Sequence, residues 1–334
     1  MKAIGFKTSL NIEEENSLFE FEKEKPQAKG KEILVKVSAT SINPVDYKIR
    51  SLFYQNTVLD EPTILGFDAV GIVEEIGEEV KNIAIGDKVY YSGDYRRAGS
   101  NAQYQLVDCR VAAQAPKSLT DAQIAVIPLT AWEGLFDRIK VDKSKNKTLL
   151  VIGGAGGVGS MVIQLAKKLT NLTVIATASR EESINWCKSM GADYVANHKD
   201  LINSVRELGF ENVDYIYNAA DTKGHWEATT ELIAPQGSIC EIVEFEGELD
   251  MMKLQGKSVT VAWEVIYTRI AYETDDVEEQ HEILKQLSSL IDDGIIKTTL
   301  GRTLKGFNVE NIKEAHRLSE SGKTIGKIAI DYTK

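Results

Sequence analysis

A strand-like run, a glycine-rich turn and an amphipathic run follow one another between Thr148 and Leu169, and this segment constrains the fold more than any other. Its first five residues, Thr148–Ile152, are apolar or β-branched and have the length of a buried strand. Beyond the turn, apolar residues recur at helical spacing from Val158 onward, with polar residues on the opposite face. The segment therefore predicts a strand that leads through the turn directly into a helix.

The turn carries three glycines with the spacing Gly-x-Gly-x-x-Gly, at Gly154, Gly156 and Gly159. Glycine permits a tight turn and lets the backbone approach a phosphate, and the following helix offers free N–H groups and a partial positive charge. The turn thus predicts a site for a dinucleotide pyrophosphate; the alternative is a structural strand-to-helix turn. The residues expected to bind the cofactor here are Gly154, Ala155, Gly156, Gly157, Val158 and Gly159.

The composition is that of a globular protein and excludes several classes of partner. The chain has 334 residues, which favours two domains, and 43% of them are hydrophobic. Its 39 basic and 50 acidic residues give a net charge of −11, which argues against nucleic acid or an anionic membrane as the main partner. Three cysteines, an odd and sparse number, suit a reducing compartment, and the sequence shows no signal peptide or membrane-spanning run. We therefore expect a cytoplasmic protein that acts on a small molecule.

The pattern of strand-like and helix-like runs changes near residue 121. Residues 1 to about 120 contain short β-prone runs separated by glycines and prolines, which predicts a compact, partly open barrel. From Asp121 onward, strand-like and helical runs alternate, which indicates an α/β fold with a doubly wound parallel sheet. After about Tyr267 come two helical runs and a final strand, Thr324–Asp331. These could complete either part, because periodicity does not decide between them.

Two residues at the predicted end of the second strand of this sheet bear on which dinucleotide binds. An NAD-selective site usually carries Asp or Glu there, to accept the ribose 2′-hydroxyl. Here Ser179 and Arg180 stand in that place, and a guanidinium can grip the 2′-phosphate that a carboxylate would repel. Glu181 and Glu182 follow, but acidic residues at this point fit the first turn of a helix. The sequence therefore favours NADPH; the alternative is that Arg180 is a solvated loop cation.

Seven short segments occur together along essentially the whole chain: INPVDYKIR (42–50), GFDAVGIVEEIG (66–77), GDKVYY (86–91), GSNAQYQLVD (99–108), PLTAWEGLFDRI (128–139), GGAGGVGS (153–160) and SGKTIGKIAI (321–330). With these segments in this order, the chain resembles the medium-chain dehydrogenase/reductase superfamily. It is most similar to the quinone-oxidoreductase (zeta-crystallin) branch and the proteins called zinc-type alcohol dehydrogenase-like. The resemblance implies a GroES-like β-barrel domain at 1–121, completed by 267–334, and a Rossmann domain at 122–266. It also implies a homodimer in which the sixth Rossmann strand pairs with its mate.

The resemblance allows the metal question to be argued from individual residues. In the zinc-dependent relatives, a ligand cysteine lies in the segment that here contains Asn43, and a His-Glu pair follows the glycine matching Gly66. This chain has Phe67 and Asp68 in the second place, and a phenyl ring cannot bind a metal. The cysteine cluster that binds structural zinc is missing, and the histidines and cysteines lack ligand spacing. We therefore expect no bound metal, despite the zinc in the family's label.

The missing zinc ligands change the chemistry that the resemblance implies. Alcohol oxidation draws on a Lewis acid to stabilise an alkoxide. A quinone or an α,β-unsaturated carbonyl instead accepts hydride on carbon, while hydrogen-bond donors stabilise the resulting anion. The leading interpretation is a zinc-independent, NADPH-dependent reductase of quinones or alkenals. Two alternatives stay open: a zinc-type alcohol dehydrogenase, and an NADPH-binding redox sensor or structural protein with little turnover.

The resemblance also matches individual residues of this chain to substrate and cofactor positions of the family. Asn43 would donate its amide to the substrate oxygen beside the nicotinamide, with an Asx turn before Pro44 as the alternative. Tyr54 would line the substrate entrance or else be a surface aromatic, and Lys48 stands where some relatives have a second tyrosine. Asp46 would orient Lys48 or cap the local helix. The catalytic candidates are Asn43, Lys48 and Tyr54, and the cofactor candidates besides the glycine turn are Asn43, Thr130, Ser179, Arg180, His198, Asn218, Ala219 and Lys327.

Overall fold

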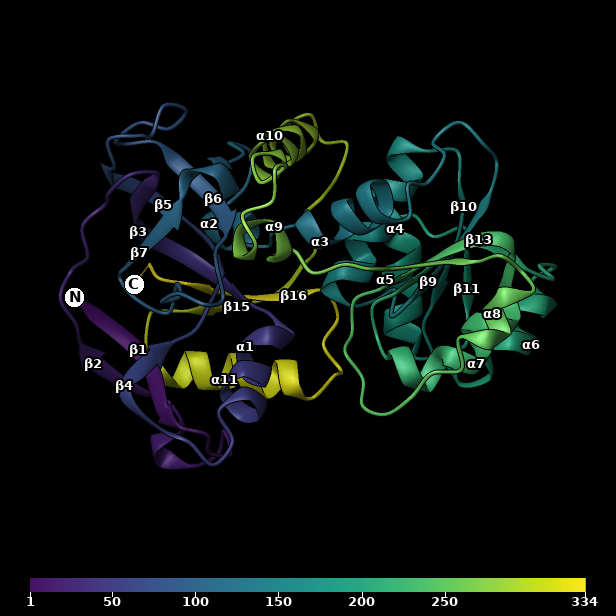
Figure 1. Cartoon of the computed structure of the whole chain (residues 1–334), viewed down its shortest axis with the longest axis horizontal. Coiled ribbons are helices and arrows are strands. Elements are labelled where there is room, and N and C mark those ends of the chain that lie inside the picture. The colour runs from purple at the N-terminus through teal and green to yellow at the C-terminus, as the bar shows by residue number, and fades with distance from the viewer. Residues whose placement is uncertain (334) are drawn as a thin grey trace. The chain divides into compact units, whose positions relative to one another are not determined.

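The computed structural model describes residues 1–333 and divides into two compact units. The first unit contains residues 1–129 and 267–333, and the second contains residues 130–266. The C-terminal segment, which periodicity could not assign, therefore belongs to the first unit. Figure 1 shows this by colour, since the purple N-terminal strands and the yellow C-terminal strands lie in the same unit.

Two sheets build the first unit. Its strands are β1 (Lys2–Thr8), β2 (Phe19–Glu22), β3 (Glu32–Ile42), β4 (Val58–Ile64), β5 (Asp68–Ile76), β6 (Lys88–Ser92), β7 (Tyr104–Asp108), β8 (Ala112–Gln114), β15 (Leu300–Lys305) and β16 (Lys327–Asp331). The larger sheet has the order β15-β16-β3-β5-β6-β8, with β7 also paired to β3, and the smaller has the order β2-β1-β4. In the larger sheet Ile328 lies opposite Ile42, so the two ends of the chain meet there.

Alternate residues of β3, namely Ile33, Val35 and Val37, lie in the core of the larger sheet, and Leu34 and residues 39–42 are buried as well. The helices of this unit are α1 (Pro44–Lys48), α2 (Asp121–Ile124), α9 (Thr268–Ala271), α10 (Glu279–Asp292) and α11 (Val309–Glu320). Helix α2 contacts β3, β5 and β16, so residues 122–129, which the sequence assigned to the second domain, pack with the first unit.

The second unit is a single parallel sheet with helices between its strands. The strands are β9 (Thr148–Ile152), β10 (Thr173–Thr177), β11 (Tyr194–Ala196), β12 (Val213–Asn218), β13 (Ile233–Glu241) and β14 (Thr260–Trp263). The helices are α3 (Leu129–Trp132, which begins at the junction), α4 (Gly157–Leu169), α5 (Glu181–Met190), α6 (Leu201–Glu207), α7 (Thr222–Leu232) and α8 (Met252–Gln255). The strand order is β11-β10-β9-β12-β13-β14, and every pairing is parallel.

This order places the predicted glycine turn after β9, where the strand order of the sheet reverses. The chain runs outward from β9 to β10 and β11, then returns to the other side of β9 for β12. Such a switch of direction marks where open α/β sheets bind ligands, at the carboxyl ends of the strands. The predicted fold class, a doubly wound Rossmann sheet with a separate N-terminal β domain, is confirmed. None of the helices in residues 1–333 is long and apolar enough to cross a membrane.

Candidate functional site

The glycine turn after β9 is held by close packing at two of its three motif positions. A Cβ atom at Gly154 would lie 2.8 Å from the Cβ of Ala176, and one at Gly159 would lie 2.3 Å from the carbonyl oxygen of Gly153. Both distances are too short for a real side chain. Gly153 itself has φ +81°, a conformation that favours glycine. These glycines are therefore required for the turn itself.

Gly156 differs from them, because the protein leaves room for a side chain there. It is the N-cap of α4, with φ −73° and ψ 171°, which any residue can adopt. The nearest atom to an added Cβ would be the Gly153 carbonyl oxygen at 3.5 Å, an ordinary contact. The open space beside Gly156 lies at the N-terminus of a 13-residue helix, where N–H groups lack intrahelical partners. A pyrophosphate group fits this arrangement.

Hydrogen bonds from neighbouring elements fix the turn. The backbone N–H of Gly153 donates to Oγ1 of Thr177, at the end of β10, over 2.9 Å. The indole N–H of Trp186, on α5, donates to Oγ of Ser160 over 2.7 Å, and this hydroxyl donates to the Gly156 carbonyl over 2.6 Å. The turn is thus tied to both the strand and the helix beside it, so its open space is preorganised.

The residues predicted to select the cofactor lie at the same edge of the sheet. Ser179 and Arg180 directly follow β10, and His198 follows β11, the parallel neighbour of β10. Ser179 and His198 are half-buried and Arg180 is exposed. Glu181 and Glu182 occupy the first turn of α5, as predicted. Fold topology therefore brings a hydroxyl, a guanidinium and an imidazole to one edge without placing an acidic residue at the end of β10.

A second histidine, which the sequence reasoning missed, lies beside His198. The ring centroids of His198 and His225 are 6.4 Å apart and the rings are perpendicular. Burial lowers the pKa of His225, with nearby Asp221 acting in the opposite direction. Because 27 positions separate the two histidines in the numbering, only the return of the chain past β9 brings them together.

Three other cofactor candidates occupy structural positions in the second unit. Asn218 ends β12, and its amide is used within the next turn, donating to the carbonyl of Asp221 over 3.1 Å and accepting from the N–H of Ala220 over 3.2 Å. Ala219 follows it and is half-buried. Thr130 is half-buried at the start of the unit, and its carbonyl accepts a hydrogen bond from the Tyr217 hydroxyl over 2.7 Å. Contacts of these residues with a cofactor stay predictions.

In the first unit, Asn43, Asp68 and Lys327 form a polar cluster inside the β structure. The amide nitrogen of Asn43 donates to Oδ2 of Asp68 over 2.8 Å, and the Asn43 amide oxygen accepts from the Lys327 ammonium. The ammonium also lies 3.8 Å from Oδ2 of Asp68, and the side chains of Lys327 and Asp68 are only 10% and 3% exposed. The predicted cofactor lysine is thus placed with the predicted substrate asparagine.

Two further groups hold this polar cluster in place. The Ser92 hydroxyl donates to Oδ1 of Asp68 over 2.7 Å. The buried Asp46 carboxylate accepts the backbone N–H of Asn43 over 2.7 Å and that of Gly66 over 2.8 Å. Asp46 therefore caps α1, as one of the two predicted alternatives stated, and also links α1 to the segment before β5.

Burial changes the acid–base properties of the charged groups in the polar cluster. Burial raises the pKa of Asp46 to about 7, although the two backbone N–H donors favour its ionised form. Burial lowers the pKa of Lys327, while the charges of Asp68 and Asp46 act in the opposite direction. Burying a charged group costs free energy because water is removed from it. Groups with pKa values shifted in this way are common at functional sites.

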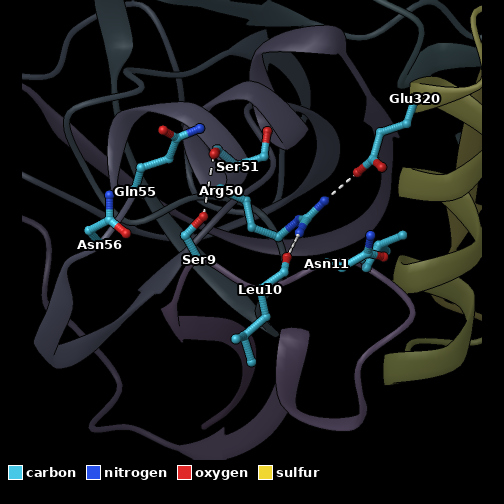
Figure 2. Close-up of a pocket in the computed structure, with 9 residues that line it drawn as sticks. Ser9, Leu10, Asn11, Arg50, Ser51, Gln55, Asn56 and Glu320 are labelled. Carbon is cyan, nitrogen blue, oxygen red and sulfur yellow. Dashed lines mark hydrogen bonds and ion pairs between the residues drawn. The ribbon is translucent and has the colours of Figure 1, made fainter.

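Lys48 and Tyr54 lie on the segment that leads away from this cluster. Lys48 ends α1, and the Tyr54 ring packs edge-on against Phe6 with centroids 5.8 Å apart. Nearby, a cavity of about 380 Å³ is lined by residues between β1 and β2, by the segment after α1 and by Glu320. Figure 2 shows the buried Arg50 guanidinium there, bonded to the Leu10 carbonyl and the Glu320 carboxylate. Its charge is therefore compensated within the protein.

The positions that hold zinc in zinc-dependent relatives carry no suitable donor set here. Phe67 packs its ring 5.9 Å from that of Tyr267, in an apolar contact. Asn43 and Asp68 are joined to an ammonium group, which repels a divalent cation. Within residues 1–333, no group of three or more His, Cys, Asp or Glu side chains could hold a metal ion. The residues present do not fit zinc, and the expected absence of metal stays a prediction.

Comparison with known proteins supplies the family. Residues 29–119 match the alcohol dehydrogenase GroES-like domain, and residues 190–330 match the family described as zinc-binding dehydrogenase. A zinc-type alcohol dehydrogenase-like protein from Staphylococcus epidermidis is 43% identical to this chain, over 99% of both. The chain belongs to the medium-chain dehydrogenase/reductase superfamily. The resemblance inferred from the seven segments is thereby confirmed, and the chain is an oxidoreductase of that superfamily.

Other members of the superfamily extend the comparison. A 2-methylene-furan-3-one reductase from Solanum lycopersicum is 31% identical, and a chloroplastic NADPH-dependent alkenal/one oxidoreductase from Arabidopsis thaliana is 28% identical; each alignment covers 91% of this chain and 73% of the relative. A solved structure named for zinc-dependent alcohol dehydrogenase, from Rhizobium etli, is 40% identical with a TM-score of 0.94, over 99% of this chain and 98% of that one. The names of these superfamily members thus differ in substrate.

Proposed function

We propose that this medium-chain dehydrogenase/reductase transfers hydride from NADPH to a quinone or an α,β-unsaturated carbonyl without a zinc ion. The observation that carries the proposal is the polar cluster of Asn43, Asp68 and Lys327. It joins an amide and an ammonium group, both hydrogen-bond donors, at two positions, Asn43 and Asp68, that the resemblance matches to metal-ligand segments of the zinc-dependent relatives. Donors of this kind stabilise an oxyanion on an acceptor, which is the help that conjugate reduction needs.

The choice of NADPH rests on the carboxyl edge of the parallel sheet. Gly156 leaves space for a pyrophosphate at the start of α4, and Ser179 and Arg180 follow the next strand without an acidic residue at its end. A guanidinium there favours the 2′-phosphate. The Arabidopsis relative is named for both NADPH and alkenal or enone substrates, which agrees with this choice.

The experiment is steady-state oxidation of NADPH and of NADH by the purified protein with a panel of quinones, alkenals and enones. Turnover with NADPH and at least one of these acceptors is expected, with little change after dialysis against a chelator. One tightly held zinc per chain, with activity lost on chelation and restored by zinc, would favour an alcohol dehydrogenase. Tight NADPH binding without turnover on any acceptor would favour the redox sensor.

Association of two copies is part of the same proposal. Strand β14 ends the parallel sheet and pairs with β13 in the described part of the chain. Trp263, on β14, has 46% of its surface exposed and stacks on Phe245. An open edge beside an exposed aromatic favours pairing with a second copy. Light scattering should give the mass of a dimer, and a monomer at all concentrations would contradict this part of the proposal.

A further inference from the structure

The Lys327 ammonium is buried in the polar cluster but not fully used there. A lysine ammonium carries three N–H donors. One is donated to the amide oxygen of Asn43, and the Asp68 carboxylate, 3.8 Å away, can take at most one more. At least one donor therefore has no partner in the described residues. The Lys327 side chain keeps 10% of its surface exposed.

The charges that act on this ammonium come from two elements, β5 and α1. Asp68 begins β5 and Asp46 lies on α1, while Lys327 begins β16. Asp68 is held by Ser92 and Asn43, and Asp46 by two backbone N–H groups, so neither carboxylate can turn away. The ammonium is therefore kept at one place by the Asn43 amide oxygen and the Asp68 carboxylate, as a preorganised electrostatic group must be.

We propose that Lys327 binds the carbonyl oxygen of the acceptor and donates a proton to the oxyanion formed when hydride is added. This deepens the proposed function and rests on it. It assigns Lys327, one of the cofactor candidates, to the acceptor, because the lysine is joined to Asn43, which is predicted to donate to the substrate oxygen as well as to contact the cofactor. Asn43 and Asp68 are positioning residues in this scheme.

The proton and electron balance is that of a conjugate reduction. Bound NADPH supplies a hydride, two electrons and a proton nucleus, to the β-carbon of the acceptor. The π electrons of the acceptor shift until the negative charge rests on its oxygen. One N–H bond of Lys327 then breaks as an O–H bond forms, which leaves an enol, or the keto tautomer of a hydroquinone when the acceptor is a quinone. That tautomer becomes the hydroquinone when water removes the added ring C–H proton and returns a proton to the second oxygen. Water returns a proton to the amine, and the enol tautomerises to the saturated carbonyl.

Burial makes Lys327 a better proton donor than a surface lysine. Loss of water around the ammonium disfavours its charged form and lowers its pKa, so proton release is easier. General acid catalysis of this kind is worth about 10²–10⁴-fold in rate. An arginine at the same place would keep the positive charge but would not release a proton.

The test compares variants of the whole protein with the wild type. Lys327→Met alone leaves Asp68 as an unpaired buried carboxylate, so the double variant Lys327→Met/Asp68→Asn removes both charges and keeps the fold testable by thermal unfolding. Lys327→Arg separates charge from proton donation. Lys305→Met, at an exposed lysine on the neighbouring strand β15, is the matched control.

The double variant is expected to lose at least about 100-fold in kcat with an unchanged NADPH Kd. Lys327→Arg is expected to keep the acceptor KM but lose kcat, and Lys305→Met to match the wild type. A primary amine such as ethylamine should restore part of the activity of Lys327→Ala, which a purely structural role would not allow. Weaker NADPH binding with unchanged kcat in the Lys327 variants would overturn the proposal and assign the lysine to the cofactor.

A measurement without turnover separates this inference from the proposed function. 4-Nitrophenol is an oxyanion mimic whose phenolate is visible by absorbance. Its titration in the presence of wild-type protein should shift to lower pH, since Lys327 stabilises the phenolate, and the double variant should abolish the shift. No shift, or an equal shift with the double variant, would overturn the oxyanion site. If no acceptor is reduced while the shift is present, the proposed function fails and the site stands.

Discussion

Gly156→Ala is expected to weaken NADPH binding strongly while leaving the protein folded. The added methyl group meets nothing closer than the Gly153 carbonyl oxygen at 3.5 Å, and φ −73° is allowed for alanine. Alanine lowers the conformational entropy of the unfolded chain relative to glycine, which stabilises the folded protein by about 0.4–1 kcal/mol. It is also a poorer N-cap than glycine, which costs a similar amount, roughly 0.5–1 kcal/mol. The free energy of unfolding should therefore change by less than about 1 kcal/mol.

The same methyl group fills the space where a pyrophosphate would lie against the start of α4. Each charge-assisted hydrogen bond to phosphate that it blocks is worth about 1.5–3 kcal/mol. Loss of one raises the NADPH Kd by roughly 10- to 150-fold, because 1.4 kcal/mol is a factor of about ten. The assay is a titration of NADPH followed by energy transfer from protein tryptophan to the nicotinamide, beside chemical unfolding of both proteins.

Gly159→Ala is the matched control, because its Cβ would lie 2.3 Å from the Gly153 carbonyl oxygen. This overlap forces the backbone to move, and overpacking of this kind costs about 1–3 kcal/mol of stability. Gly156→Ala should therefore raise the NADPH Kd with little change in stability, whereas Gly159→Ala should lower the stability. If Gly156→Ala binds NADPH as tightly as the wild type, the pyrophosphate does not lie at Gly156 and the assignment of the turn is refuted.

Arg180→Ala should raise the Kd of NADPH by about 10- to 150-fold and that of NADH hardly at all, because the guanidinium is assigned to the 2′-phosphate; equal effects in parallel titrations would contradict that assignment. Glu241 is buried, with the Thr222 hydroxyl donating to it over 2.9 Å, and burial raises its pKa from 4.5 to about 7. Between these pH values the unfolded state loses the proton first, so Glu241 contributes a fall in the free energy of unfolding as pH rises. Glu241→Gln should flatten that fall in urea unfolding curves measured from pH 4.5 to 8, whereas parallel curves for the two proteins would argue against a buried neutral carboxyl. Burial raises the pKa of the thiols of Cys109 and Cys187 to about 11 and that of Cys240 as well, so native protein should resist iodoacetamide and unfolded protein should gain three alkyl groups by mass spectrometry; rapid labelling of the native protein would conflict with this packing.

The second unit was predictable because its signals are local. Strand Thr148–Ile152 was placed with its observed bounds, and the glycine turn and α4 follow it directly in sequence. The hydrophobic run, the glycine spacing and the helical period all lie within 22 consecutive residues, Thr148–Leu169. Ser179 and Arg180 could be placed as well, because β10 follows α4 at once and parallel strands end at one edge.

The first unit was less predictable because its strands owe their pairing to distant segments. Strands β1, β2, β4, β8 and β15 were not predicted individually. Of these, β4 and β15 are largely exposed, so neither shows a clear alternation of buried and exposed residues. The final strand was found, but its destination was not, because β16 pairs with β3 across the length of the chain. No local period records a partner that lies almost 300 residues away.

The sequence by itself determined the Rossmann sheet, the dinucleotide turn and the missing histidine and cysteine ligands, because these depend on residue type and short spacing. Only the tertiary structure decided that Lys327 meets Asn43 and Asp68. Lys327 was predicted as a cofactor candidate, and only the register of β16 against β3 shows that its side chain lies beside α1 and β5. Long-range strand pairing is selected by the packing of the whole core. It therefore also determines which buried charges become neighbours.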